Sequence, residues 1–125
     1  MMATAVPEDL NSEIELAVQA NACLSTLFPR AGTLMLGNAG VEFRGRGGAG
    51  FVQVPWDALS VVRVDVYGSF VRSVELHVAD GRSLSFVVSD GAEVVRCMSR
   101  HLDRSQLVPA TKPLSHLIGK LRHRR

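Results

Sequence analysis

The chain has 125 residues, which is enough for one domain with its own hydrophobic core. Hydrophobic residues make up 46% of it and charged residues 21%, a balance that excludes a chain disordered throughout. No uncharged apolar stretch reaches the roughly 18 residues that a membrane span needs. The acidic N-terminal segment lacks the pattern of a secretory signal, so the sequence predicts a cytoplasmic location.

The formal net charge of +2 is unevenly distributed along the chain. From Arg96 to the end, eight basic residues accompany one acidic residue, Asp103, so this segment carries +7 and residues 1–95 carry −5. A basic end of this kind attracts polyanions such as anionic lipid or nucleic acid.

After a flexible lead-in at residues 1–10, the chain predicts a series of short β-strands. In each strand, apolar residues alternate with polar ones or β-branched residues dominate. The expected strands cover residues 14–18, 32–36, 41–44, 51–55 and 60–67. In the first strand, Ile14, Leu16 and Val18 are expected on the buried face. Pro55 is expected to end the fourth strand, because proline has no N–H to donate to a neighbouring strand.

Residues 71–88 predict a β-hairpin. The apolar side chains of each strand lie two residues apart and so share one face: Val74, Leu76 and Val78, then Leu84, Phe86 and Val88. These two faces coincide only if the loop has an odd number of residues. The sequence therefore predicts a three-residue loop, Ala79 to Gly81, with Gly81 in the left-handed conformation.

An amphipathic helix is predicted over residues 90–103, where the apolar spacing becomes helical. Asp90 is expected to cap its first turn, with Glu93 completing the capping pattern. The apolar stripe consists of Val94, Val95, Met98 and Leu102. Strands followed by one helix predict a mostly β (α+β) domain over residues 11–104, with a separate basic amphipathic tail at 105–125.

The tail holds a second, short predicted helix that begins near Pro113. Its apolar residues have helical spacing and basic residues accompany them: Leu114, Leu117, Ile118 and Leu121, with Lys120, Arg122, Arg124 and Arg125. Because so short a helix is marginal in water, it is expected to dock on the domain itself, on a membrane interface or on a partner protein. Nucleic acid is a weaker alternative, since no recognition helix, aromatic sheet or basic groove accompanies the tail.

Few residues show the spacing of a catalytic or metal site. The glycine-rich stretch 45–50 matches the form of a dinucleotide motif, but a strand follows it, so a hairpin loop is predicted. The four histidines lack metal-ligand spacing with one another, and two cysteines are too few for a disulfide scaffold or a zinc site. Cys97 and His101, one helical turn apart, could form a thiolate–imidazole pair, but nothing in the sequence orients them. We therefore expect no enzyme, no cofactor and no metal.

The sequence also predicts the burial of the tryptophan, of one histidine and of the two cysteines. Trp56, the one tryptophan, is predicted to anchor the core at a bend between strands, with an exposed anchor at a partner-binding edge as the alternative. His77 alternates outward on its strand and is expected to be solvated. Cys23 and Cys97 are expected to be reduced and buried as small apolar residues.

The segment FVQVPWDAL at residues 51–59 resembles the bacterial domain-of-unknown-function family 956. The hairpin at residues 32–44 and the strand at 84–88 that runs into Asp90 share the similarity. It extends from about Asn11 to Leu121, and VQVPWD is its most specific part, followed by residues 115–120.

This resemblance implies an accessory or regulatory role beside a mannose-family sugar transporter of the phosphoenolpyruvate-dependent phosphotransferase system, because family members are encoded beside such transporters. It implies no phosphoryl transfer and supplies no catalytic residues. The element order is also similar to the pleckstrin-homology and GRAM-like architecture, an antiparallel sheet or open barrel with a C-terminal helix. The expected partners are membrane subunits of the transporter and an anionic membrane surface, and open sheet edges would allow a homo-oligomer. A DNA-binding regulator of the transporter operon is the alternative.

Overall fold

The computed structural model describes residues 9–23, 29–48 and 51–110. These residues form one eight-stranded sheet and one α-helix, which confirms the predicted mostly β fold. The strands are β1 (Ile14–Cys23), β2 (Arg30–Gly37), β3 (Gly40–Gly45), β4 (Phe51–Pro55), β5 (Leu59–Tyr67), β6 (Phe70–Val78), β7 (Ser83–Val88) and β8 (Leu107–Pro109). The helices are α1 (Gly91–Met98) and the short 3-10 turns η1 (Arg46–Gly48), η2 (Trp56–Ala58) and η3 (Arg104–Gln106).

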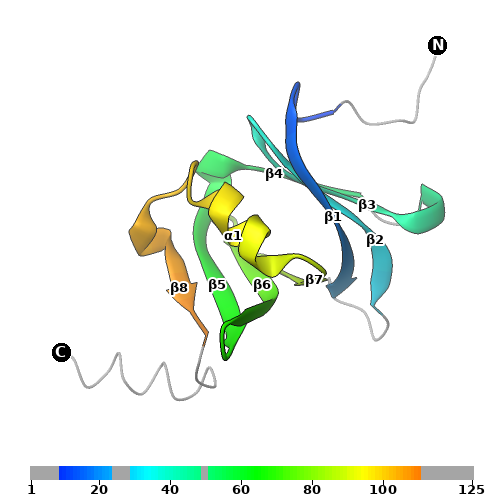
Figure 1. Ribbon diagram of the computed structural model, residues 1–125. Coiled ribbons are helices and arrows are strands. Elements are labelled where there is room, and N and C mark those ends of the chain that lie inside the picture. The colour runs from blue at the N-terminus through cyan, green and yellow to red at the C-terminus, as the bar shows by residue number, and fades with distance from the viewer. Residues whose placement is uncertain (1–8, 24–28, 49–50, 111–125) are drawn as a thin grey trace, which may run out of the picture.

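The described strands lie in the order β4-β3-β2-β1-β7-β6-β5-β8, so β4 and β8 form the open edges. β8 runs parallel to β5, whereas the other neighbours are antiparallel. In Figure 1, β1 to β4 lie on one side and β5, β6 and β8 on the other, with α1 and β7 between them. α1 contacts β6, β1 and β2, so it covers the junction of the two groups of strands.

β1 follows the predicted alternation from half-buried Leu16 onward, whereas β3 does not alternate, since Val41, Glu42 and Phe43 are all buried. Val18, Ala20 and Ala22 are buried, so small apolar residues continue the buried face to the end of the strand. Ile14 is exposed, contrary to prediction, because the pairing of β1 with β2 shifts by one residue between Ile14 and Leu16. Such a β-bulge breaks the alternation of faces and redirects side chains near it.

Two sequence-based predictions concern the loops beside β4, and both are confirmed. β3 and β4 pair antiparallel on either side of the glycine-rich stretch, which is therefore a hairpin loop rather than a dinucleotide motif. β4 ends at Pro55 on the edge of the sheet, where the missing N–H costs no internal hydrogen bond.

The β6–β7 hairpin has the predicted three-residue loop. Val78 N donates to Arg82 O at 2.9 Å, which closes a loop of residues 79–81, and Gly81 has a φ of 101°. Val74 pairs with Phe86, and Leu76 with Leu84. All four of these side chains are buried, so the two apolar faces coincide in the core.

α1 is shorter than predicted. It ends at Met98 rather than at residue 103, and the chain continues in a turn in which His101 N and Leu102 N both donate to Met98 O. Asp90 occupies the predicted N-cap position of α1, but its side chain makes no cap hydrogen bond, and Glu93 pairs with Arg96 instead of completing the capping pattern. The predicted stripe does face the sheet, with Val94, Met98 and Leu102 buried and Val95 half-buried.

Beyond α1, η3 leads into β8, which extends the sheet to Pro109. Sequence patterning assigned these residues to the tail, because three residues are too few to show alternation. The lead-in is described from Asp9, and Leu10 N is hydrogen-bonded to the Glu42 carboxylate at 2.9 Å. The predicted terminal helix lies outside the described residues.

Cys97 is buried as predicted, but Cys23 at the end of β1 is exposed. It follows Ala22 on the opposite face of the strand, so alternation places it outward. His77 is half-buried rather than solvated, since its ring lies 3.2 Å from Glu75 Oε1 and 3.3 Å from Ser83 Oγ. Within the described residues, no helix has the length and apolar character to cross a membrane.

Candidate functional site

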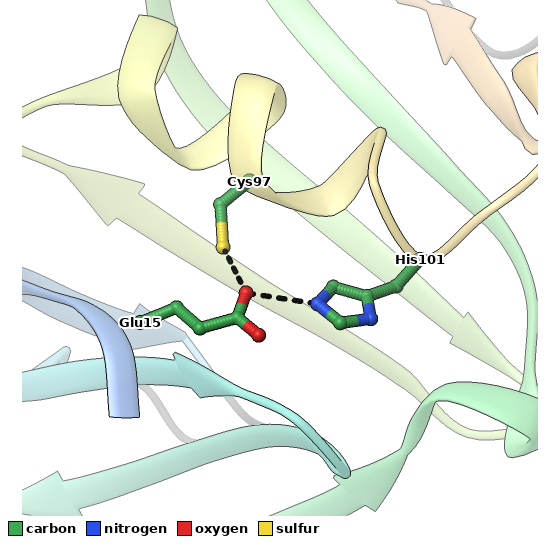
Figure 2. Close-up of side chains that lie close together, drawn as sticks. All are labelled: Glu15, Cys97 and His101. Carbon is green, nitrogen blue, oxygen red and sulfur yellow. Dashed lines mark hydrogen bonds and ion pairs between the residues drawn. The ribbon is translucent and has the colours of Figure 1, made fainter. Parts of the chain in front are cut away.

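A carboxylate, a thiol and an imidazole meet between β1 and α1. Glu15 extends from β1, Cys97 from the last turn of α1, and His101 from the turn that follows it (Figure 2). Among the described residues, these three form the one group of His, Cys, Asp or Glu side chains whose ligand atoms all lie within 4.8 Å of one another. This Glu15–Cys97–His101 group is the candidate site.

One oxygen of Glu15 joins the other two side chains. Glu15 Oε1 accepts a hydrogen bond from the Cys97 thiol at 3.4 Å and lies 2.9 Å from His101 Nε2. Because an ionised carboxylate can only accept hydrogen bonds, this contact requires a proton on Nε2. Arg100 is more distant, with its nearest guanidinium nitrogen 3.8 Å from the same oxygen.

The β-bulge of β1 accounts for the position of Glu15. Ile14 pairs with Gly37 and Leu16 with Leu36, so Glu15 is the extra residue on its strand. Bulges commonly re-aim a side chain in this way. Cys97 lies in the last turn of α1, which contacts β1, and the turn after α1, in which His101 N donates to Met98 O, brings His101 to the same point.

Trp56 forms one wall of the site. Its ring stacks on the His101 ring with centroids 4.6 Å apart and planes within 6° of parallel. Trp56 Nε1 donates to Gly37 O at 2.9 Å, and the half-buried ring packs against the core. The stacking fixes the plane of the imidazole and holds its Nε2 toward Glu15.

The environment of Cys97 disfavours a thiolate. Burial, reinforced by the hydrogen bond and negative charge of Glu15, raises the pKa of Cys97 to about 11. The pKa of Glu15 is lowered, chiefly by its hydrogen bond with His101. At neutral pH the site therefore holds a carboxylate and a neutral thiol, which is the opposite of the activation that a thiolate nucleophile requires.

Spacing along the sequence brought Cys97 and His101 into consideration, but it missed Glu15. Glu15 is 82 residues from Cys97 and 86 from His101. Its position depends on a bulge and on long-range packing, for which a single sequence carries no signal. The eight tail residues predicted to dock on a partner or membrane all lie outside the described residues.

Comparisons with known proteins connect the chain to one family and one fold. The sequence profile of a family described as domain of unknown function DUF956 matches residues 6–121. No protein of curated function matches the chain in sequence. The fold is similar to the crystal structure of the C-terminal domain of an unknown protein from Leishmania infantum, with a TM-score of 0.62, 8% identity, and coverage of 70% of this chain and 82% of that one. At this identity, the similarity shows the fold alone.

Proposed function

The chain belongs to the DUF956 family of domains of unknown function, and we propose that it is a non-enzymatic accessory or regulatory protein of a mannose-family sugar phosphotransferase system. The family resemblance supports the choice of transporter. In this proposal the domain works at the cytoplasmic face and docks through one end, on the transporter or on the membrane beside it.

The observation that carries the docking proposal is the point at which the described chain leaves the sheet. Ala110 N donates to Val64 O at 2.6 Å, and Pro109 pairs with Val64. β8 runs parallel to β5, so both strands point toward the β5–β6 turn (Figure 1). The described chain therefore ends, at Ala110, near this turn.

The β5–β6 turn carries two exposed aromatic side chains. Tyr67 is 71% exposed and Phe70 is 56% exposed, on either side of Gly68, whose φ is 66°. Exposed aromatic residues are favoured at membrane interfaces and at the centres of protein interfaces. Arg72 lies beside them, with its guanidinium carbon 5.6 Å from the centroid of the Tyr67 ring.

Aromatic and basic groups at one end of the domain suit a surface that is both apolar and anionic, such as that of a membrane protein and the bilayer around it. In the tail, Leu114, Leu117, Ile118 and Leu121 would supply apolar contact, and Lys120, Arg122, Arg124 and Arg125 would meet anionic groups. Near an anionic surface, each basic residue contributes about 1 kcal/mol of attraction.

The fold is compatible with such a role. The strand order, the pairing of β1 with β7 and the helix that follows β7 support the pleckstrin-homology or GRAM-like architecture. The neutral Cys97 thiol supports a role without nucleophilic chemistry at the Glu15–Cys97–His101 group.

Co-purification from gently solubilised native cells tests the proposal. Four tagged chains are compared by mass spectrometry: full length, truncated after Ala110, Tyr67→Ser with Phe70→Ser, and Val87→Ser. The last is a matched control, because Val87 is an exposed apolar residue on β7, outside the β5–β6 turn. Transporter membrane subunits are expected with the full chain and the control, and severalfold less with the other two. Equal recovery with all four chains would refute docking through this end, and recovery with none would refute the transporter link.

The charge of +7 carried by the segment from Arg96 to Arg125 favours one second candidate, a DNA-binding regulator of the transporter operon. This function predicts DNA retention that weakens steeply with salt and falls as the tail arginines are removed. Filter binding of the full chain and of the chain truncated after Ala110, at two salt concentrations, distinguishes it from the transporter proposal.

A further inference from the structure

We propose that Glu15, Cys97 and His101 bind a zinc ion, with a water molecule in the fourth coordination position. The sequence offered no zinc site because its cysteines and histidines lack the usual spacing. The fold adds a carboxylate from β1 to the thiol and imidazole of α1 and its following turn, and so completes a set of three ligands.

The donor set matches the chemistry of zinc. Zn²⁺ binds cysteine sulfur, histidine nitrogen and carboxylate oxygen, and sites with three protein ligands keep one position for water. Ionised Glu15 and a Cys97 thiolate would together carry two negative charges, which balance the ion. Magnesium and calcium prefer all-oxygen sites, so a thiol and an imidazole disfavour them.

All three ligand atoms lie within 4.8 Å of one another, and two of their distances can be compared with those around a bound zinc ion. With bonds of 2.0 to 2.3 Å, atoms at the corners of a tetrahedron lie about 3.3 to 3.7 Å apart. Here Glu15 Oε1 lies 3.4 Å from Cys97 Sγ and 2.9 Å from His101 Nε2. Small side-chain shifts would replace the two hydrogen bonds with bonds to the ion. The Cys97 thiol would release its proton to solvent, and the neutral imidazole would carry its one proton on Nδ1, which leaves Nε2 free to bind.

Contacts from residues outside the group orient its side chains, and one side of the site is open to solvent. The Trp56 ring stacks on His101, and its N–H is bound by Gly37 O, so the imidazole is oriented by a second layer of contacts, as in many metal sites. Cys97 is buried, whereas the side chains of Glu15 and His101 are 27% and 19% exposed and leave a route from solvent. Arg100, the cation nearest Glu15, has a side chain that is 57% exposed and can turn toward water.

A metal at this position would link β1 to the end of α1. α1 contacts β1, β2 and β6, so it spans the junction at which β1 pairs with β7. Zinc binding would therefore fasten the helix across that junction, and the folded protein would become more resistant to unfolding in proportion to its zinc occupancy.

Cobalt substitution tests the site directly in the full chain after treatment with a chelator. Co²⁺ bound to a thiolate gives a near-ultraviolet charge-transfer band, and tetrahedral Co²⁺ gives intense visible bands. We expect both in the wild-type chain, and we expect excess Zn²⁺ to displace them. A wild-type spectrum without the charge-transfer band would overturn the proposal.

Matched variants identify the ligands. Cys97→Ser is compared with Cys23→Ser, and His101→Gln with His77→Gln, because Cys23 and His77 lie outside the group. The variants at Cys97 and His101 should bind Co²⁺ and Zn²⁺ at least tenfold more weakly and lose the rise in melting temperature that Zn²⁺ gives the wild type. The two controls should retain both properties.

Circular dichroism shows whether each variant folds. If Cys97→Ser does not fold, the Cys23→Ser spectrum still assigns the thiolate band, since Cys97 is then the remaining cysteine. Unchanged zinc binding by folded His101→Gln, or loss of the band in Cys23→Ser, would place the metal elsewhere and refute the site.

Discussion

Replacing Glu42 with glutamine removes the charge of a buried carboxylate while preserving the shape of its side chain. Glu42 lies on β3 and is the acidic residue that is buried among those the structure describes. Its Oε2 accepts hydrogen bonds from Leu10 N at 2.9 Å and Gln53 Nε2 at 3.0 Å. Its Oε1 accepts from Asn11 Nδ2 at 3.0 Å and from Asn11 N at 3.4 Å. Every one of these partners is a donor.

The magnitude follows from this geometry. In Glu42→Gln, one of the two oxygens becomes an NH₂ group that faces two donors, so two hydrogen bonds are lost unless the Gln53 amide turns its oxygen toward the new NH₂ group, in which case one is lost. A hydrogen bond to a charged group contributes about 1.5 to 3 kcal/mol. Because the variant no longer buries a charge, part of this loss is recovered. We therefore expect the free energy of unfolding to fall by about 3 kcal/mol, and the melting temperature by about 10 °C.

Urea denaturation of the full chain at pH 7, followed by circular dichroism, measures the effect. Glu93→Gln is a matched control, because it removes the same charge from an exposed ion pair with Arg96 on α1. An exposed pair of this kind contributes less than about 0.5 kcal/mol. A Glu42→Gln variant as stable as Glu93→Gln would refute the view that the carboxylate organises this part of the fold.

Three further predictions concern pH, packing and thiol reactivity. Burial opposes ionisation of Glu42, but its hydrogen bonds outweigh this cost and hold its pKa below the usual 4.5. The contribution of the carboxylate to protein stability is therefore complete above pH 4.5 and declines as the pH falls through the lower pKa. In acid titrations followed by urea denaturation, the stability difference between wild type and Glu42→Gln should shrink over that range. A Cβ at Gly91 would lie 2.2 Å from Val71 O, so Gly91→Ala should lower the free energy of unfolding by about 2 kcal/mol or more, and a stability within about 0.5 kcal/mol of wild type would contradict this close packing of α1 on β6. In the folded chain at pH 7, iodoacetamide should modify exposed Cys23 and spare Cys97, because burial and the neighbouring Glu15 raise the pKa of Cys97 to about 11. Mass spectrometry should find one adduct before unfolding and two after it, and rapid double labelling of the folded chain would contradict the prediction.

Local regularities in the sequence predicted the parts of the fold that depend on local geometry. The spacing of Leu76 and Leu84 determined the loop length of the β6–β7 hairpin, because a loop with an even number of residues would have separated their faces. Pro55 marked the end of β4 through its missing donor. In both cases a few neighbouring residues contain the whole physical constraint.

Features that depend on distant contacts were beyond the same reasoning. The bulge at Glu15 interrupts a regular alternation, and only the packing of β1 against β2 shows where the extra residue falls. β8 is too short to show a pattern and exists because β5 offers it an edge. The candidate site combines both limits, since it requires the bulge and a helix residue 82 positions farther along the chain.

The short pairing between β1 and β7 has a consequence for how the domain opens. Within β1 to β4, and within β5 to β7, strands that follow one another in the sequence also pair in the sheet. Each group can therefore form from local contacts and at low entropic cost. The two groups meet through four residue pairs, from Ala20 with Val88 to Cys23 with Ser85. Sub-global opening should separate the molecule along this seam before either group unravels, and backbone amides there should exchange with solvent sooner than those at the centre of each group. α1 and the side chains beneath it then hold the two groups together, and a ligand that strengthens the contact of α1 with β1 would make opening along the β1–β7 pairing less frequent.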